Sequence, residues 1–92
     1  MRFEFKSSFG KSLKAYQKPE QEELKNATRQ TIEMFSGNRT ITPGAGLKQL
    51  RRNYWEVRKG LKARMLFHWQ GDLIEFILAG DHNDIKRFLK NL

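Results

Sequence analysis

The chain has 92 residues, of which 38% are hydrophobic and 12% aromatic, enough for the core of one small domain and too many for a disordered tail. It contains no cysteine, which excludes disulfides, zinc–thiolate sites and thiol catalysis. Lysine and arginine number 18 against 10 acidic residues, and the net charge of +8 favours a polyanionic partner such as nucleic acid or an acidic protein. No apolar run is long enough for a signal peptide core or a membrane span. We therefore expect a soluble cytoplasmic protein with a single domain over residues 1–92.

The N-terminal residues predict a short strand and a first helix. Arg2–Lys6 alternate polar and apolar side chains, as in a half-buried strand. Ser7 or Ser8 is expected to cap the helix that follows. Three apolar positions at helical spacing form its buried face: Phe9, Leu13 and Tyr16.

A second helix is expected to begin at Pro19, because proline suits the first turn of a helix. It ends at Ser36-Gly37, a favourable C-terminal cap, and the two helices form a helical hairpin. Gly37–Gly46 has the composition of a loop.

The second half of the chain predicts a three-stranded antiparallel meander and a short C-terminal helix. The strands are Tyr54–Lys59, Leu61–Trp69 and Leu73–Ala79, and the helix runs from about Asp81 to Asn91. The predicted fold class is α+β, with helices against one face of an antiparallel sheet.

Tight turns at Lys59–Leu61 and at Gln70-Gly71 define a strand register. It pairs Val57 with Ala63, Trp55 with Met65, Glu56 with Arg64, Phe67 with Ile74, Met65 with Phe76 and Ala63 with Leu78. One face is then apolar: Trp55, Val57, Ala63, Met65, Phe67, Ile74, Phe76 and Leu78. The opposite face is expected to be the open side of the sheet, with Glu56, Arg58, Lys62, Arg64, His68 and Glu75 among Leu66, Leu73 and Ile77.

Basic residues are concentrated between positions 47 and 64. This stretch has one acid, Glu56, and seven basic residues: Lys48, Arg51, Arg52, Arg58, Lys59, Lys62 and Arg64. A solvated surface explains any single lysine. The whole patch, rich in arginine, favours binding of nucleic acid or the ribosome, because guanidinium groups match phosphates.

Arg58 and Arg64 lie on the predicted open face, and two interpretations fit them. Arg64 can form a cross-strand ion pair with Glu56, which on a surface contributes only about 0.2–1 kcal/mol. The two arginines can also clamp a phosphate and stabilise the transition state of phosphoryl transfer.

His82 follows the last predicted strand, near the start of the last helix. Histidine at this place is either a polar residue of the helix cap or a general acid or base, since its ordinary pKa is about 6.5. His68 at a strand end is interpreted as structural. Asp81 and Asp84 give only a weak signal for Mg²⁺, and we expect neither a metal site nor a cofactor.

Residues 46–89 resemble the second half of toxins of the RelE/ParE superfamily, the toxin halves of type II toxin–antitoxin pairs. Five segments carry the resemblance in the family's order: Leu47–Leu50 (LKQL), Tyr54–Arg58 (YWEVR), Arg64–Phe67 (RMLF), Asp72–Leu78, and Gly80–Ile85 with its histidine. The N-terminal strand and helical hairpin match the same order, so the resemblance covers nearly the whole chain.

The resemblance implies a ribosome-dependent endonuclease that cuts mRNA in the A site without metal, by attack of a 2′-OH on the adjacent phosphate. Arg64 would stabilise the phosphorane, Arg58 would position phosphate, and His82 would be general acid or base, with Glu56 as the second acid/base candidate. Expected nucleic-acid contacts are Lys48, Arg51, Arg52, Lys62 and Lys86.

The resemblance also implies an acidic antitoxin, disordered when free, that wraps the helical hairpin and forms a hetero-oligomer with the toxin. One departure leaves the target open, since Lys86 stands where many nuclease members have an aromatic residue. The alternatives are a ParE-like inhibitor of DNA gyrase without enzymatic activity, and a non-toxic basic module that binds nucleic acid.

Overall fold

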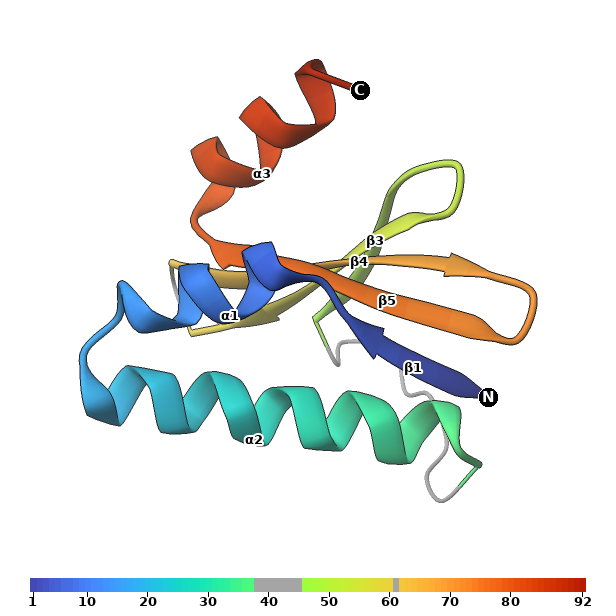
Figure 1. Ribbon diagram of the computed structural model, residues 1–92, viewed down its shortest axis with the longest axis horizontal. Helices are drawn as coiled ribbons and strands as arrows, with labels where there is room; N and C mark the ends of the chain where they lie inside the picture. Colours follow the sequence, from blue (N-terminus) through green and yellow to red (C-terminus); the bar gives the residue numbers. More distant parts are fainter. Residues whose placement is uncertain (38–45, 61) are drawn as a thin grey trace.

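The computed structural model describes residues 1–37, 46–60 and 62–92, and within them it has the predicted α+β architecture (Figure 1). The described strands form one mixed sheet in the order β1-β5-β4-β3-β2, in which β1 runs parallel to β5 and the other pairs are antiparallel. The strands are β1 (Arg2–Phe5), β2 (Leu47–Arg51), β3 (Tyr54–Lys59), β4 (Ala63–Gln70) and β5 (Leu73–Gly80). The helices are α1 (Ser7–Lys14), α2 (Lys18–Phe35) and α3 (His82–Lys90).

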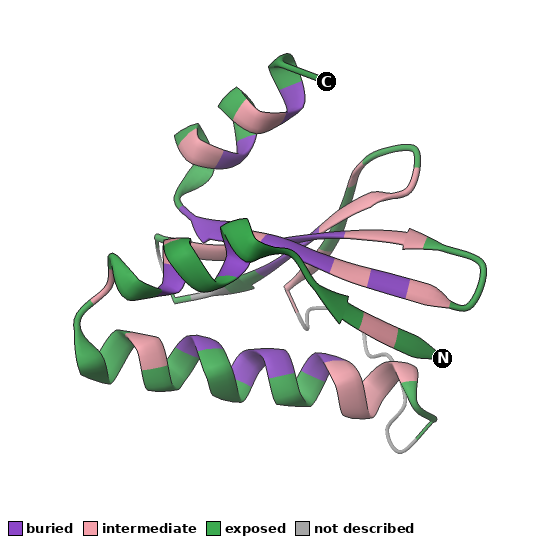
Figure 2. Ribbon diagram, viewed as in Figure 1, coloured by how far each residue is buried: buried purple, intermediate pink, exposed green. Residues whose placement is uncertain are grey.

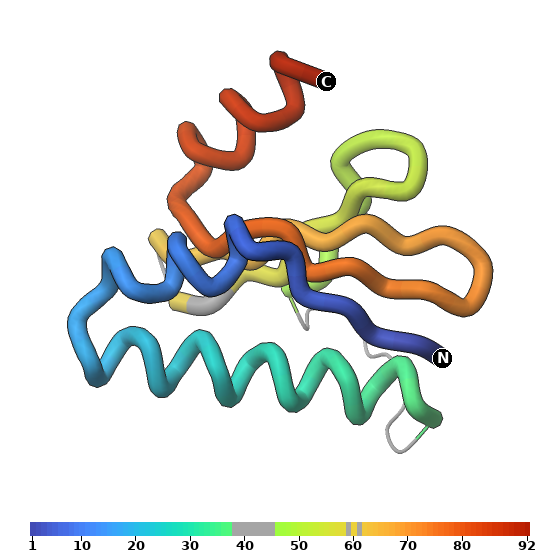
Figure 3. Tube along the Cα trace, viewed as in Figure 1, coloured from blue at the N-terminus to red at the C-terminus, as the bar shows by residue number. Residues whose placement is uncertain are grey.

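The helices lie on both sides of the sheet. Figure 1 shows α1 and α2 running in opposite directions, with α2 along one side of the sheet and α3 projecting from the other. The trace in Figure 3 places the N-terminus at the free end of β1 and the C-terminus at the far end of α3. Burial follows this arrangement, since the buried positions of α2 face the sheet (Figure 2).

The larger core lies between the sheet and the first two helices, as the apolar face predicts. Helices α1 and α2 contribute Phe9, Leu13, Leu24 and Ala27, and the strands contribute Val57, Met65, Phe67, Ile74, Phe76 and Ala79. Phe67, Ile74 and Phe76 are fully buried. Apolar burial of this kind is the main stabilising contribution to a small domain.

The sheet contains one strand that the sequence pattern does not predict. Residues Leu47–Arg51 form β2, which pairs antiparallel with β3. Only Leu47 and Leu50 are half-buried, and the register shifts between Gln49 and Arg51. A bulge breaks the alternation of polar and apolar residues, which explains why the pattern does not predict this strand.

The predicted register between β3 and β4 is wrong by two residues. Val57 lies opposite Met65, and Glu56 lies opposite Leu66 rather than Arg64, because the turn includes Lys62 and does not include Lys59. Since side chains alternate with a period of two, this shift leaves every residue on its predicted face.

The predicted register between β4 and β5 is wrong as well. Phe67 pairs with Phe76 and not with Ile74, and a bulge then shifts the pairing so that Leu66 lies opposite Leu78. The bulge moves Leu78 from the predicted apolar face to the other face, and Ala79 enters the larger core in its place.

The face predicted to be open is partly covered by α3. Leu66 and Ile77 of the sheet are buried there against Ile85 and Leu89 of the helix, with Leu50, Tyr54, Leu78 and Phe88 packed around them. The apolar residues within the predicted polar face are therefore a second core. An amphipathic helix removes them from water.

Helix α1 covers part of an edge of β5. Strand β1 pairs with β5 only as far as Phe76, and beyond it the Ser8 hydroxyl donates to the Ile77 carbonyl while the Ala79 N–H donates to Ser12 Oγ (2.8 Å). The Ser8 side chain therefore bonds a backbone carbonyl at the edge of β5 rather than capping α1. The N-cap residue of α1 is Lys6.

The second predicted helix is confirmed with proline in its first turn and Ser36 at its C-cap. Most of the predicted loop at Gly37–Gly46 lies outside the described residues. No helix of the described residues is long and apolar enough to cross a membrane.

Candidate functional site

A hollow of about 280 Å³ lies where β5 ends and α3 begins. Its lining consists of Lys62, Arg64, Asp81, His82 and Asn83. Lys62 belongs to the turn before β4, Arg64 lies near the start of β4, and His82 is the first residue of α3. The sheet brings them together because Arg64 pairs directly with Gly80, two residues before His82.

Arg64 forms an ion pair with a buried carboxylate. Its Nη1 donates to Glu56 Oε2 at 2.7 Å, and the Arg64 and Glu56 side chains are only 15% and 2% exposed. The predicted pair therefore forms, but diagonally, since Arg58 rather than Glu56 lies directly opposite Arg64. A charge-assisted hydrogen bond at this depth fixes the guanidinium in one orientation.

The Arg64 guanidinium keeps unused hydrogen-bonding capacity. Its Nε is buried and has no hydrogen-bond partner among the described residues. A donor buried this fully is out of reach of a ligand in the hollow, so a ligand can bond Arg64 only through the exposed part of its side chain.

His82 is positioned by a capping box at the start of α3. The Asp84 N–H donates to Asp81 Oδ1 (2.8 Å), and the Asp81 N–H donates to Asp84 Oδ2 (3.0 Å). The Asp84 N–H lowers the pKa of the Asp81 carboxyl below its ordinary value. The reciprocal bonds define where α3 starts and hence where the exposed His82 lies.

Close packing at Gly80 adds to this constraint. A Cβ at position 80 would lie 2.7 Å from the Asp84 Cβ and from Oδ2 of the same side chain. Glycine is therefore required where the chain leaves β5 for the capping box.

The hollow combines two cationic side chains with an imidazole. Lys62 and Arg64 can bind phosphate oxygens, and the His82 imidazole is a side chain of the kind that serves as general acid or base. This combination can stabilise charge on a phosphoryl group and move a proton at an adjacent oxygen.

The structure brings three of the predicted site residues together: Arg64, His82 and Lys62. Arg58 is exposed and lies directly opposite Arg64 on the neighbouring strand β3. Glu56 is 1% exposed, so a substrate oxygen has no access to its carboxylate, and the acid/base role expected for it does not fit its burial.

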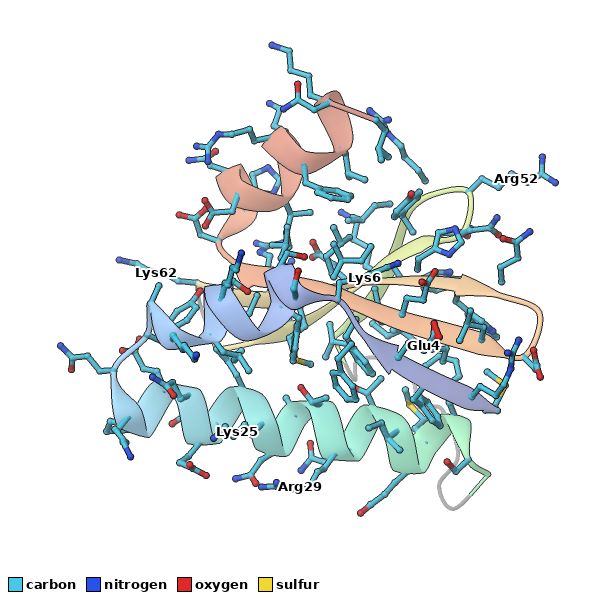
Figure 4. All side chains as sticks on the ribbon, in the orientation of Figure 1. Glu4, Lys6, Lys25, Arg29, Arg52 and Lys62 are labelled. Carbon is cyan, nitrogen blue, oxygen red and sulfur yellow. The ribbon has the colours of Figure 1, made fainter. Side chains whose placement is uncertain are left out.

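The other predicted nucleic-acid contacts do not line the hollow: Lys48, Arg51, Arg52 and Lys86. Arg51 donates from Nη1 to the Leu89 carbonyl (2.9 Å) and so binds the C-terminal turn of α3. Figure 4 shows Arg52 and Lys62 at opposite ends of the molecule.

Asp81 and Asn83 also line the hollow, although the sequence pattern does not predict that they bind substrate. The spacing of Asp81 and Asp84 is a capping signature that is readable in the sequence. The two carboxylates are helix-capping groups, and this spacing explains them without the Mg²⁺ site that they weakly suggested.

Comparisons with known proteins identify the fold. No protein-family model and no curated protein matches the chain. Among solved structures, YafQ from E. coli superposes with a TM-score of 0.69 at 17% identity, covering 92% of this chain and 98% of YafQ. A copper-bound mutant toxin from Helicobacter pylori gives a TM-score of 0.67 at 13% identity, covering 92% and 98% of the two chains.

A chain of the RelB–RelE antitoxin–toxin complex from Methanococcus jannaschii gives a TM-score of 0.65 at 20% identity, with 92% of this chain and 96% of that chain covered. Identities this low establish the backbone arrangement and not a shared activity. The protein has the RelE-like fold of these toxins.

Proposed function

We propose that this chain is the toxin of a type II toxin–antitoxin pair and that it acts in the cytoplasm as a ribosome-dependent mRNA endonuclease. One observation supports the proposal: Arg64 and His82, two of the four residues that the family resemblance assigns to catalysis, line the same hollow. The RelE-like fold supports it.

The reaction would be attack of an RNA 2′-OH on the adjacent phosphorus. A bond forms between the 2′-oxygen and phosphorus, the bond from phosphorus to the 5′-oxygen breaks, and the products are a 2′,3′-cyclic phosphate and a 5′-OH. The Arg64 guanidinium, oriented by Glu56, stabilises the charge of the phosphorane through its exposed part. The attacking 2′-OH loses a proton and the leaving 5′-oxygen gains one; His82 transfers one of these two protons and solvent water the other.

The remaining residues position the substrate. Lys62 at the rim of the hollow and the exposed Arg58 bind flanking phosphates. Glu56 is a positioning residue in this proposal, because its ion pair orients Arg64 while its burial keeps it away from RNA. No metal is needed for this mechanism, since the cationic side chains supply the positive charge.

The proposed partner is an acidic antitoxin. A net charge of +8 favours an acidic polypeptide, and the similar RelE was solved in a complex with its antitoxin RelB. We propose that such a partner wraps the helical hairpin and screens part of the basic surface, forming a hetero-oligomer.

The test is induced expression in bacteria with primer extension on abundant messages, with and without a translation inhibitor. We expect growth arrest and new 5′ ends that require translating ribosomes. His82→Gln and Arg64→Lys should each abolish the new ends. Lysine at position 64 keeps a cation for Glu56, so this variant should still fold, which circular dichroism would verify.

Lys25→Gln is the matched control, because Lys25 lies on the outer side of α2, away from the hollow (Figure 4). It should remain fully toxic. Intact messages in arrested cells would overturn the nuclease proposal in favour of a target such as gyrase, and intact messages in growing cells would overturn toxicity altogether.

A further inference from the structure

A second hollow, of about 420 Å³, lies on the same face of the sheet as the candidate site. It is formed by β3, β4 and β5 together with α3, Lys6 and the first turn of α1. Its volume is in the range of ligand pockets, and the roles assigned to the first hollow do not involve it.

One side of this second hollow is aromatic. Tyr54 meets the His68 ring edge-to-face at a centroid distance of 4.8 Å, and Phe88 of α3 lies 6.3 Å from Tyr54. Ile77 adds an apolar surface to the lining. Rings in this arrangement offer faces and edges on which a flat heterocycle can pack.

The other side is polar but carries no excess charge. Lys6 Nζ lies 2.9 Å from Glu75 Oε2, and His68 Nδ1 lies 3.6 Å from Glu75 Oε1. Glu75 therefore neutralises Lys6 in the lining of the second hollow. The second hollow consequently favours a neutral polar ligand over a phosphate.

Hydrogen-bonding groups remain for such a ligand. No described residue bonds to the Tyr54 hydroxyl or to Nε2 of His68, although both side chains line the hollow. Tyrosine both donates and accepts hydrogen bonds, and a neutral imidazole with its proton on Nδ1 accepts at Nε2.

We infer that this hollow binds a nucleobase of the RNA. Nucleobases have the required chemistry, since they are neutral, flat and apolar on their faces, and polar at their edges. The inference rests on the proposed RNA substrate and adds a base-binding site distinct from the phosphate-binding hollow. The two hollows are separated along β4, because Arg64 and His68 are four residues apart, which corresponds to about 13 Å at 3.3 Å per residue.

The two histidines of the chain provide separate reporters, because His68 lies in the second hollow and His82 in the first. The test is a titration of the purified full chain followed by NMR of the histidine and tyrosine rings. The probes are the four nucleoside 5′-monophosphates and, separately, inorganic phosphate. We expect inorganic phosphate to move only the His82 signal, and at least one nucleotide to move both His68 and Tyr54 with saturation.

Tyr54→Leu keeps apolar volume but removes the ring and the hydroxyl. It should weaken the nucleotide response of His68 by about 5- to 150-fold, the effect of losing one base–aromatic stack. The matched control is Tyr16→Leu, which replaces the other tyrosine of the chain and should leave the response unchanged.

Three results would overturn the inference: no saturable movement of His68 with any nucleotide, movement of His68 by inorganic phosphate alone, or an unchanged response in Tyr54→Leu. Cleavage of mRNA without a His68 response would overturn the base site alone. A His68 response without cleavage would keep the base site and overturn the nuclease proposal.

Discussion

The ion pair between Glu56 and Arg64 takes two charges out of water. The desolvation cost of such a pair is offset only while both partners are present, and removal of one leaves the other buried and unpaired. The same contact that orients the proposed catalytic arginine therefore also couples its placement to the stability of the sheet.

Glu56→Ala should destabilise the protein by about 3–5 kcal/mol, because the Arg64 cation would remain buried without a counter-ion. The measurement is the free energy of unfolding in urea. Glu22→Ala is the control, since it removes an exposed carboxylate 3.7 Å from Lys25. This variant should change stability by less than about 1 kcal/mol. Equal effects of the two substitutions would contradict the buried-pair account.

At the scale of single residues, the sequence predicts that Glu56 and Arg64 lie near each other, but it does not predict how far Glu56 is buried. The predicted register places Glu56 directly opposite Arg64, and this register is incorrect. The ion pair nevertheless forms, because long side chains also reach the diagonal neighbour on the adjacent strand. The acid/base role predicted for Glu56 does not fit its burial, and nothing in a sequence pattern reports that a charged residue on a polar face is fully buried.

Among the elements, α3 contributes most to the candidate site. Its capping box places His82, its Ile85 and Leu89 form the second core, and its last turn is bonded by Arg51. Changes at the start of α3 should therefore act on the site and on stability together.

Gly80→Ala should destabilise the protein by about 1–3 kcal/mol, the usual cost of overpacking, because the new Cβ would overlap the Asp84 side chain. Gly10→Ala is the matched comparison. Gly10 lies within α1, and a Cβ added there would meet no atom within 4 Å, so alanine should stabilise the helix by about 0.5–1 kcal/mol. Thermal unfolding of both variants checks the prediction, and shifts of the same sign would refute it.

The capping box also predicts a dependence on pH. The folded-state pKa of Asp81 is lowered by the Asp84 N–H, so the ionised cap stabilises the fold above the ordinary pKa of aspartate, near 3.8, and this contribution disappears as the pH falls further. An asparagine at the same position would cap equally well without titrating. Asp81→Asn should therefore lose less stability than the wild type between pH 7 and pH 3, as measured by urea unfolding. Equal losses of unfolding free energy in the wild type and in Asp81→Asn would show that the Asp81 cap does not titrate in this range.

For the whole molecule, the net charge of +8 predicts that the proposed binding of RNA depends on the salt concentration. If Arg58, Lys62 and Arg64 each contact a phosphate, the logarithm of affinity for single-stranded RNA should fall with the logarithm of salt with a slope of about −2. A rise from 50 to 200 mM salt should then weaken binding about 20-fold.

Fluorescence anisotropy with a labelled RNA oligonucleotide measures this slope. Lys62→Gln should reduce its magnitude by about 0.7, because one phosphate contact is lost. A slope that does not change in this variant would remove Lys62 from the proposed interface.

Apart from β2, the order of the elements follows from the sequence alone, because periodicity, caps and turn residues act locally and need no partner. The same holds for the apolar face of β3 and β4, which survives a two-residue error in register since side chains alternate with a period of two. The basic character of the molecule and the candidate residues Arg64 and His82 are likewise readable from the residues themselves.

Other features were decided by tertiary contacts. The bulge that turns Leu78 to the second core, the packing of α3 over Leu66 and Ile77, and the burial of Glu56 all depend on which segments meet in space. The meeting of Arg64 with His82 depends on the same packing, because the pairing of Arg64 with Gly80 brings together residues that lie far apart in the chain. Local propensities specify the strands and helices, but long-range pairing and burial determine which side chains share a site.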